Sequence, residues 1–254
     1  MTGDFIEKPI SAKQFVLATD LDGTFLGGSE TDRRKLYDWI EANRDTVGLI
    51  FVTGRDPMFI EDMCGDGLPW PDYAIGDVGT TIAQIVDRKV TPLPGLESEI
   101  SRRWADSGAR VRAALTGMAG LTEQPTPFRY RVSFDLDPAA LDPQAESLIN
   151  EMGLDVLISD NRFFDVLPGG ISKGPSLRLL ADHLGIAHGR VLAAGDTMND
   201  LSMLTLGLPA VAVGGSEAEL LSRVDGLQHV HKSDAIGAAG ILDAIRVLEL
   251  HPSL

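Results

Sequence analysis

Short apolar segments alternate with longer amphipathic segments along most of the chain. Apolar runs rich in Val, Ile, Leu and Phe, separated by helix-like stretches, are typical of parallel strands buried on both faces of a sheet. The pattern predicts strands at residues 15–19, 48–53, 73–75, 191–194 and 209–213. It predicts helices at residues 31–43, 57–64, 173–184, 199–206, 217–224 and 236–248. We therefore expect an α/β fold whose core is a doubly wound, Rossmann-like parallel sheet.

The middle of the chain has a different pattern. After an entry punctuated by Pro and Gly at residues 91–95, the order is helix, strand, helix and two short strands. The predicted bounds of these elements are residues 96–115, 130–134, 138–152, 156–159 and 163–167. This order indicates a small α+β insert at residues 82–169, between two core segments at residues 1–81 and 170–254.

Composition narrows the classes of function. Of the 254 residues, 44% are hydrophobic and 23% are charged, which is typical of a folded globular protein. No apolar stretch approaches the ~20 residues of a membrane span, and residues 1–14 lack a signal-like apolar run, so we expect a cytoplasmic location. The net charge of −15 disfavours binding to nucleic acid or anionic lipid. The single cysteine, Cys64, has no disulfide partner in the chain.

Three polar clusters directly follow three predicted strands. They are Asp20-Leu-Asp22-Gly-Thr24, Thr53-Gly-Arg55 and Gly195-Asp196-Thr-Met-Asn199-Asp200. In open parallel sheets, ligands bind outside the carboxyl ends of the strands. The three clusters are therefore expected to meet at one edge of the sheet, although they are far apart in sequence.

The acidic members of these clusters predict a metal site. Asp20, Asp22, Asp196 and Asp200 would form a dense acidic pocket, and carboxylates so close together repel each other unless a cation neutralises them. Mg²⁺ prefers oxygen ligands and is typically held by one or two carboxylates together with substrate phosphate. We therefore expect a magnesium-dependent site.

Other residues of the clusters predict a phosphate site. Gly23 and Thr24 offer a tight turn and a hydroxyl, and Thr53 offers another hydroxyl beside Gly54. Lys173 lies at the start of a predicted helix, where both its ammonium and the helix N-terminus favour an anion. Each fragment alone is typical of a loop, a helix cap or a solvated surface charge, but the ordered set behind apolar strands favours a functional site.

Taken in order, these motifs and Lys173 resemble those of the haloacid dehalogenase-like hydrolase (HAD) superfamily. The resemblance covers almost the whole chain, because the insert is similar to the α+β cap of the superfamily's Cof-like branch. Within that branch the chain is most similar to sucrose-phosphate phosphatases and related disaccharide-phosphate phosphatases. The supporting segments are Pro71-Asp-Tyr-Ala-Ile75, Val78-Gly-Thr80, Arg131-Val-Ser-Phe-Asp-Leu-Asp-Pro138 and Asp165-Val-Leu-Pro168.

The resemblance implies a HAD fold and a phosphatase that forms an aspartyl-phosphate. Asp20 would attack phosphorus, and Asp22 would protonate the leaving oxygen and then activate water. Magnesium would be bound by Asp20, the backbone carbonyl of Asp22 and Asp196, with Asp200 binding it directly or supporting a ligand. The phosphoryl group or water would be held by Thr53, Lys173 and Asn199.

The resemblance also implies a small phosphorylated metabolite as substrate, with a sugar or disaccharide phosphate expected. Arg55 would extend toward this substrate, and Tyr130, Arg131 and Asp165 lie in or near strands of the insert that would face it. The segment at residues 96–127 departs from the sucrose-phosphate enzymes, which leaves the sugar open.

The sequence leaves other functions open. A phosphomutase of the same superfamily also needs a second aspartate after the nucleophile, but it returns phosphate to sugar. A dehalogenase is disfavoured because halide departure does not require the acid chemistry of Asp22. A phosphoacceptor signalling module or a non-catalytic binding protein belongs to another class, but the former needs no insert and the latter commonly loses the nucleophile. The oligomeric state and pathway are not predicted.

Overall fold

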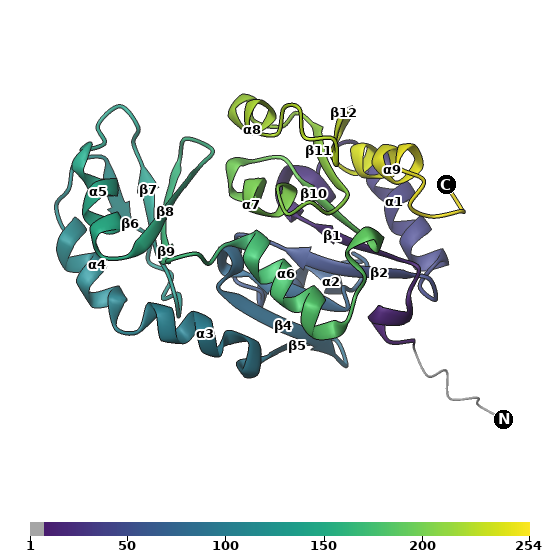
Figure 1. The fold of residues 1–254 in the computed structure, drawn as a ribbon, viewed down its shortest axis with the longest axis horizontal. Coiled ribbons are helices and arrows are strands. Elements are labelled where there is room, and N and C mark those ends of the chain that lie inside the picture. Colours follow the sequence, from purple (N-terminus) through teal and green to yellow (C-terminus); the bar gives the residue numbers. More distant parts are fainter. Residues whose placement is uncertain (1–7) are drawn as a thin grey trace.

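The computed structural model describes residues 8–254 and is built around one large sheet. Its eight strands have the order β12-β11-β10-β1-β2-β3-β4-β5, and those from β12 to β3 are parallel (Figure 1). Strands β4 and β5 form an antiparallel hairpin at one edge. The strands of this sheet are β1 (Phe15–Thr19), β2 (Val47–Val52), β3 (Tyr73–Gly76), β4 (Thr81–Val86), β5 (Lys89–Pro92), β10 (Val191–Gly195), β11 (Ala210–Gly214) and β12 (Val230–Ile236).

Helices cover both faces of this sheet. They are α1 (Glu30–Ala42), α2 (Phe59–Gly65), α6 (Lys173–Leu184), α7 (Leu201–Leu204), α8 (Ala218–Arg223) and α9 (Ala238–Val247). Short helical turns are η1 (Ile10–Ala12), η2 (Leu21–Phe25), η3 (Asp77–Gly79), η4 (His188–Arg190) and η5 (Met198–Asp200).

Alternate residues of the central strands divide the core into two layers. On β1, Val16 packs into one hydrophobic cluster with α6, whereas Leu17 packs into another with α1 and α9. Both side chains are fully buried, as expected for strands covered on both faces. The central strands are therefore held rigidly, and their carboxyl ends provide a fixed edge for a site.

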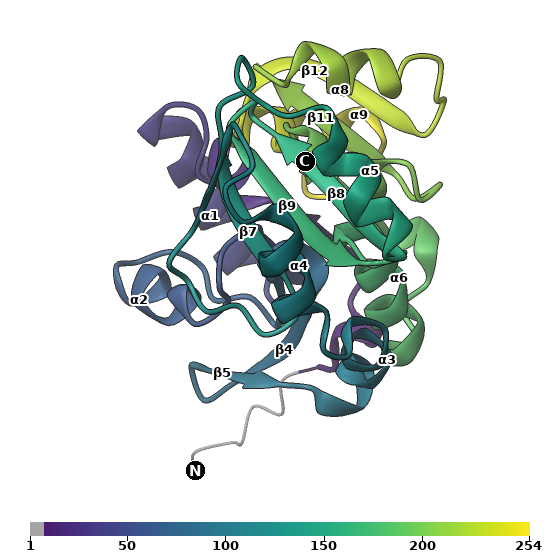
Figure 2. The same ribbon diagram turned by 90° about the vertical axis from the view of Figure 1, so that its left-hand side faces the viewer.

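A second, smaller unit lies beside the large sheet (Figures 1 and 2). Its four-stranded antiparallel sheet has the order β6-β7-β9-β8 and its own hydrophobic cluster, which includes Trp104, Phe134 and Phe164. Its elements are α3 (Pro94–Trp104), α4 (Ser107–Leu115), β6 (Leu121–Glu123), β7 (Val132–Leu136), α5 (Gln144–Glu151), β8 (Leu154–Ser159) and β9 (Phe163–Pro168). We call this unit the cap.

The predicted fold class is confirmed: the core is an α/β sheet that is parallel from β12 to β3, and the insert is a smaller α+β unit. All five predicted core strands are present within one or two residues of their expected bounds. Residues 81–92 form β4 and β5 and extend the large sheet, so we propose that the cap begins near Leu93 instead of at residue 82. Its other boundary is proposed near residue 169, where the chain leaves β9 for α6.

Two further predictions of elements were wrong. The expected helix at residues 96–115 is two helices, because Ala105 has a φ of 48° and ends α3. Residues 230–236 form the edge strand β12, and the last helix begins at Ala238 instead of residue 236. Within residues 8–254, no helix is both long and apolar enough to cross a bilayer.

Candidate active site

Asp20 lies at the tip of the central strand β1. Its backbone N–H donates to the carbonyl of Ala194 on β10, which fixes it beside the neighbouring strand end. The chain then turns through η2, where Gly23 has a φ of 80°, a backbone conformation that is unfavourable for residues with a side chain. A Cβ atom at Gly23 would lie 2.1 Å from Oδ2 of Asp196, so the turn packs directly against that carboxylate.

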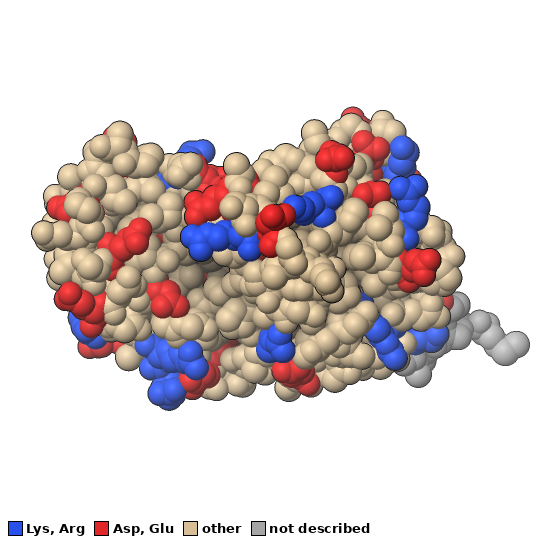
Figure 3. Space-filling view, turned by 45° about the horizontal axis from the view of Figure 1, so that its top comes forward, with Lys and Arg blue, Asp and Glu red and all other residues tan. Residues whose placement is uncertain are grey.

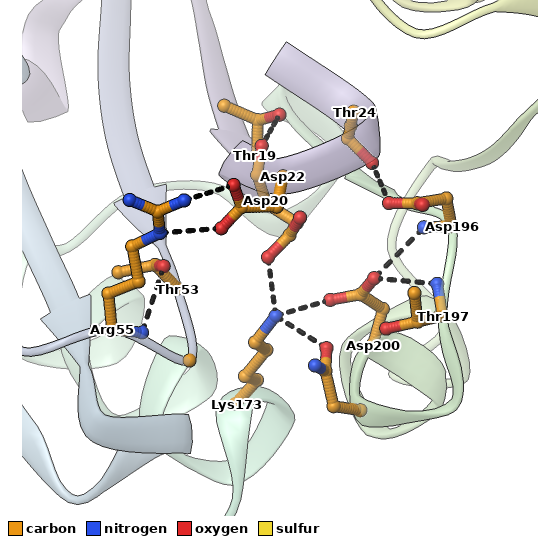
Figure 4. A network of polar contacts seen from close by, with 12 residues as sticks. Thr19, Asp20, Asp22, Thr24, Thr53, Arg55, Lys173, Asp196, Thr197 and Asp200 are labelled. Carbon is orange, nitrogen blue, oxygen red and sulfur yellow. Dashed lines mark hydrogen bonds and ion pairs between the residues drawn. The ribbon is translucent and has the colours of Figure 1, made fainter. Parts of the chain in front are cut away.

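Lys173, the first residue of α6, connects the loop after β1 to the loop after β10. Its side chain is fully buried, and its ammonium donates hydrogen bonds of 2.6 Å to Oδ1 of Asp20, Asn199 and Asp200 (Figure 4). Burial opposes its charge, but the ion pairs with Asp20 and Asp200 outweigh this effect and raise the pKa of Lys173. Lys173 is therefore a fixed cation at the centre of the cluster.

The loop after β10 is organised by Asp200. Its Oδ2 accepts hydrogen bonds from the backbone N–H groups of Asp196 and Thr197, and its Oδ1 accepts one from Lys173 (Figure 4). Asp196 in turn accepts a hydrogen bond of 2.5 Å from the hydroxyl of Thr24. Thr24, predicted to contact phosphate, is thus placed to orient Asp196.

The acidic cluster has the chemistry of a cation site. Carboxylate oxygens of Asp20, Asp196 and Asp200 lie within 4.8 Å of one another. Three carboxylates beside one ammonium leave about two negative charges uncompensated, which a hard divalent cation with oxygen ligands would balance. Burial and then the charge of Asp200 raise the pKa of Asp196 to about 7. Burial likewise raises the pKa of Asp20, an effect that the Lys173 ammonium opposes.

Asp22, predicted as an acid/base and metal-binding residue, lies outside this cluster. Its carboxylate accepts hydrogen bonds of 2.7 Å and 2.5 Å from Nε and Nη2 of Arg55 (Figure 4). The Arg55 guanidinium also lies over the ring of Phe59, 4.6 Å from its centroid. Arg55 was predicted to face the substrate, and here it holds Asp22 at the mouth of the site.

The loop after β2 contributes the remaining core residues. Oγ1 of Thr53 accepts a hydrogen bond of 3.1 Å from the backbone N–H of Arg55, and the Thr53 side chain is buried. The carbonyl of Gly54 accepts a 2.9 Å hydrogen bond from Nη2 of Arg131, which belongs to the cap. Arg131 is only 5% exposed and also pairs with Asp165, so it joins the cap to the core.

A cavity of about 560 Å³ connects these residues to the cap. Its core side includes Asp20, Asp22, Asp196 and Asn199, and its cap side includes Gln124, Arg162 and Phe163. Acidic and basic side chains both gather around the hollow between the two lobes (Figure 3). A larger cavity of about 670 Å³ shares none of these lining residues and contains none of the carboxylate cluster, so it lies away from the site.

The structure thus gathers Asp20, Lys173, Asp196, Asn199 and Asp200 into one cluster. Arg55 pairs with Asp22, and Arg131 and Asp165 lie at the back of the cavity. Tyr130 is half-buried and packs against apolar side chains of both units. Their functional roles stay predictions.

Two residues at the site, Glu217 and Asp160, were not predicted from the sequence. The Glu217 carboxylate accepts hydrogen bonds from the backbone N–H groups of Met198, in the core, and of Asp160, in the cap. A signal for Glu217 was present, because it closely follows a predicted strand, as the other clusters do. Asp160 also follows a predicted strand, at residues 156–159, but it makes the contact through its backbone N–H, which no pattern of side chains indicates.

Comparison with known proteins gives consistent matches. The profile of the sucrose-6F-phosphate phosphohydrolase family matches residues 13–249. A glucosylglycerol-phosphate synthase of Pseudomonas anguilliseptica is 38% identical over 231 residues, which are 90% of this chain but only 30% of that relative. A mannosylfructose-phosphate phosphatase of Agrobacterium fabrum is 30% identical over 250 residues, covering 93% of this chain and 98% of the relative.

A solved structure supports the fold. The sucrose-phosphatase of Synechocystis sp., in complex with sucrose and phosphate, superposes with a TM-score of 0.83. The match covers 93% of this chain and 98% of the other at 24% sequence identity. This likeness establishes the common core-and-cap architecture.

Proposed function

Because the chain belongs to the sucrose-6F-phosphate phosphohydrolase family, a HAD phosphatase family, we propose that it hydrolyses the phosphate monoester of a small sugar-containing metabolite. One observation carries the proposal. Asp20 stands at a strand tip, 2.6 Å from a buried ammonium and beside two further carboxylates, at the floor of a cavity between core and cap. This arrangement supports the proposal, because a carboxylate that could attack phosphorus lies beside a positive charge in a sheltered space.

In the first step, a carboxylate oxygen of Asp20 attacks phosphorus. A bond forms between this oxygen and phosphorus, while the bond from phosphorus to the sugar oxygen breaks, which gives an aspartyl-phosphate. The Lys173 ammonium is placed to offset the negative charge of the phosphoryl oxygens. Thr53 and Asn199 are proposed to hold these oxygens in position.

Asp22 is proposed to transfer the protons of both steps. It donates a proton to the departing sugar oxygen. It then takes a proton from the water that bonds to phosphorus, while the bond between Asp20 and phosphorus breaks, which releases inorganic phosphate and restores the Asp20 carboxylate. Its carboxylate is about half exposed and ion-paired with Arg55. To reach the leaving oxygen, the Asp22 carboxylate would turn from Arg55 toward the substrate.

The donor set fits Mg²⁺, which we propose as the cofactor. Asp20 and Asp196 would hold it with the backbone carbonyl of Asp22, and Asp200 would fix the loop that carries Asp196. When bound, Mg²⁺ supplies positive charge that offsets the phosphate and the carboxylates.

The cap side of the cavity suits a sugar. Phe163 offers an aromatic face, while Gln124, Ser159 and Arg162 offer hydrogen-bonding groups. The names of the relatives suggest which sugars to test. They are sucrose-6F-phosphate, glucosylglycerol phosphate and mannosylfructose phosphate, with simple hexose phosphates for comparison.

The test is release of inorganic phosphate from this panel, with magnesium or with a chelator. We expect one of the disaccharide-type phosphates to be hydrolysed only with magnesium, and Asp20→Asn to lower kcat at least about 1,000-fold. Asp38→Asn, an exposed change on α1, is the control and should retain full activity. Equal activity of Asp20→Asn and wild type would refute the nucleophile, and phosphate retained on a rearranged sugar would indicate a phosphomutase.

A further inference from the structure

Glu217, in the loop between β11 and α8, contacts three parts of the molecule. Its backbone N–H donates a 2.9 Å hydrogen bond to the carbonyl of Asp196. One carboxylate oxygen accepts a 2.6 Å hydrogen bond from the backbone N–H of Met198. The other accepts a 2.7 Å hydrogen bond from the backbone N–H of Asp160, in the cap. Glu217 thus binds the Asp196 loop at two points, through its backbone and through its side chain, and it also binds the cap.

The cap presents a tight turn to this carboxylate. Asp160 and Asn161 connect β8 to β9 with φ values of 54° and 48°, and Arg162 closes the turn by donating to the carbonyl of Ser159. This backbone is typical of a two-residue hairpin turn and fixes the direction of the Asp160 N–H. The turn reaches across to the loop before α8 (Figure 1).

The contact between Asp160 and Glu217 lies beside two cavities. Asp160 borders the candidate active-site cavity, and both Asp160 and Glu217 border a second cavity of about 590 Å³. We call the hydrogen bond between Asp160 and Glu217 the bridge. Such a bridge can open or close without repacking a hydrophobic interface.

The bridge lies opposite another contact between the two units. In the strand order, Glu217 follows β11, on one side of the Asp20 strand, whereas Gly54 follows β2, on the other side. Arg131 of the cap binds Gly54, and Asp160 of the cap binds Glu217. The two contacts hold the cap on both sides of Asp20.

We propose that Glu217 is a positioning residue that couples closure of the cap to the placement of Asp196. This inference rests on the proposed phosphatase function. When the cap is closed, each oxygen of the carboxylate has a backbone N–H partner, and charge-assisted hydrogen bonds of this kind are the strong ones. Opening the cap removes one partner and frees the side chain to release Met198. Closure and a correctly placed Asp196 therefore favour each other.

The first test uses magnesium binding and activity. Glu217→Ala removes both acceptors, whereas Glu217→Gln keeps only one oxygen acceptor. We expect Glu217→Ala to weaken Mg²⁺ binding by roughly 10- to 100-fold, measured by calorimetry with the metal alone. We expect its kcat/KM to fall by a similar factor. Both values for Glu217→Gln should lie between those of Glu217→Ala and wild type. Glu219→Gln is the matched control, because this exposed side chain forms an ion pair with Arg223 of the same helix, and its values should equal those of wild type.

The second test measures the position of the cap without any turnover. Spin labels are placed at Asn150→Cys on the cap and Ser222→Cys on α8, both exposed positions. The native Cys64 is buried, and burial raises the pKa of its thiol to about 12, so it labels slowly. Glu217→Ala should broaden and lengthen the distance distribution, and Glu219→Gln should leave it unchanged.

The outcomes separate the two proposals. If wild type hydrolyses no phosphate ester, the phosphatase function fails, while the label distances still test the bridge. If Glu217→Ala leaves both the distance distribution and the magnesium affinity unchanged, the coupling is refuted, whatever the activity. A change in magnesium affinity with an unchanged distance would assign Glu217 to the Asp196 loop alone and would also refute the coupling.

Discussion

At the scale of single residues, charge balance governs the site. Lys173 is fully buried, yet it is stabilised as a cation because three side-chain oxygens surround its ammonium. Asp196, in contrast, is destabilised as an anion, because burial and the charge of Asp200 both raise its pKa. A site of this kind is prepared for a divalent cation, and without one it takes up protons.

Magnesium binding should therefore release a proton near neutral pH. Burial and the charge of Asp200 raise the pKa of Asp196 to about 7, and a carboxylate must lose its proton to bind a metal. We expect the apparent affinity for Mg²⁺ to weaken as pH falls from 8 to 6, by up to roughly tenfold per pH unit below the pKa. Calorimetry in buffers of different ionisation enthalpy measures both the affinity and the proton release. An affinity that is constant over this range would contradict the expectation.

The same shift has a consequence for stability without metal. The folded protein retains a proton on Asp196 between pH 3.8, the ordinary pKa, and about pH 7, whereas the unfolded chain has lost it. The contribution of Asp196 to the free energy of unfolding therefore falls as pH rises through this window and is level above it.

At the scale of elements, the site depends on turns that pack against each other. The η2 turn after β1 and the loop after β10 meet where Gly23 contacts Asp196. This approach requires both a left-handed backbone and the absence of a side chain.

Gly23→Ala should consequently impair the site as well as the backbone. The added methyl group would lie 2.1 Å from Oδ2 of Asp196 and displace it. Gly67→Ala is the matched control, because Gly67 has a φ of 100° but nothing within 4 Å of the new Cβ. Denaturant unfolding should show a loss of about 1 kcal/mol or more in both variants. Phosphate release and magnesium binding should be weakened in Gly23→Ala alone, and equal activities would contradict the packing argument.

The elements also show what a sequence can predict. The central strands are continuous apolar runs that end at a polar cluster, and their bounds were predicted within two residues. Strand β12 was missed because Lys232 and Asp234 give this edge strand the polarity of a loop. The β4–β5 hairpin was missed because Asp87 and Arg88 form its turn at positive φ without a glycine or proline to mark it.

For the candidate site, the sequence predicted which residues meet, but it did not predict how their side chains pair. Topology brings Asp20 and Asp200 together, because both follow strands whose carboxyl ends share one edge of the parallel sheet. Lys173 joins them from the first turn of α6, where the sequence predicted an anion site. The pairing of Asp22 with Arg55 depends on side-chain conformation, which no sequence pattern specifies. The backbone contact of Asp160 was equally beyond prediction.

At the scale of the whole molecule, core and cap meet through buried charge. The guanidinium of Arg131 lies 3.5 Å from the ring centroid of Phe128 and pairs with Asp165, while Oδ1 of Asp77 lies 3.9 Å from its Nη2. Burial raises the pKa of Asp77, an effect that Arg131 opposes. Arg131 therefore neutralises a carboxylate of each unit, Asp77 of the core and Asp165 of the cap.

Arg131→Met should destabilise the protein. The change leaves Asp165 and Asp77 buried without their cation, and breaking buried pairs in this way typically costs about 3–5 kcal/mol. Arg110→Met, an exposed change on α4, should alter the free energy of unfolding by at most about 0.5 kcal/mol. Urea denaturation compares the two variants. A loss below about 1 kcal/mol for Arg131→Met would show that the pair contributes little.

The contacts of Lys173 with Asp20 and of Thr24 with Asp196 span 153 and 172 positions of the chain. During synthesis, the proposed nucleophile, Asp20, and the entire cap therefore leave the ribosome before the loop that carries Asp196 is made. The cap can fold early, since its strands pair with one another, but the carboxylate cluster forms only when residues 191–200 have emerged. A nascent chain stalled before that point would carry Asp20 without Asp196 and Asp200, and we therefore expect it to be inactive in the proposed reaction.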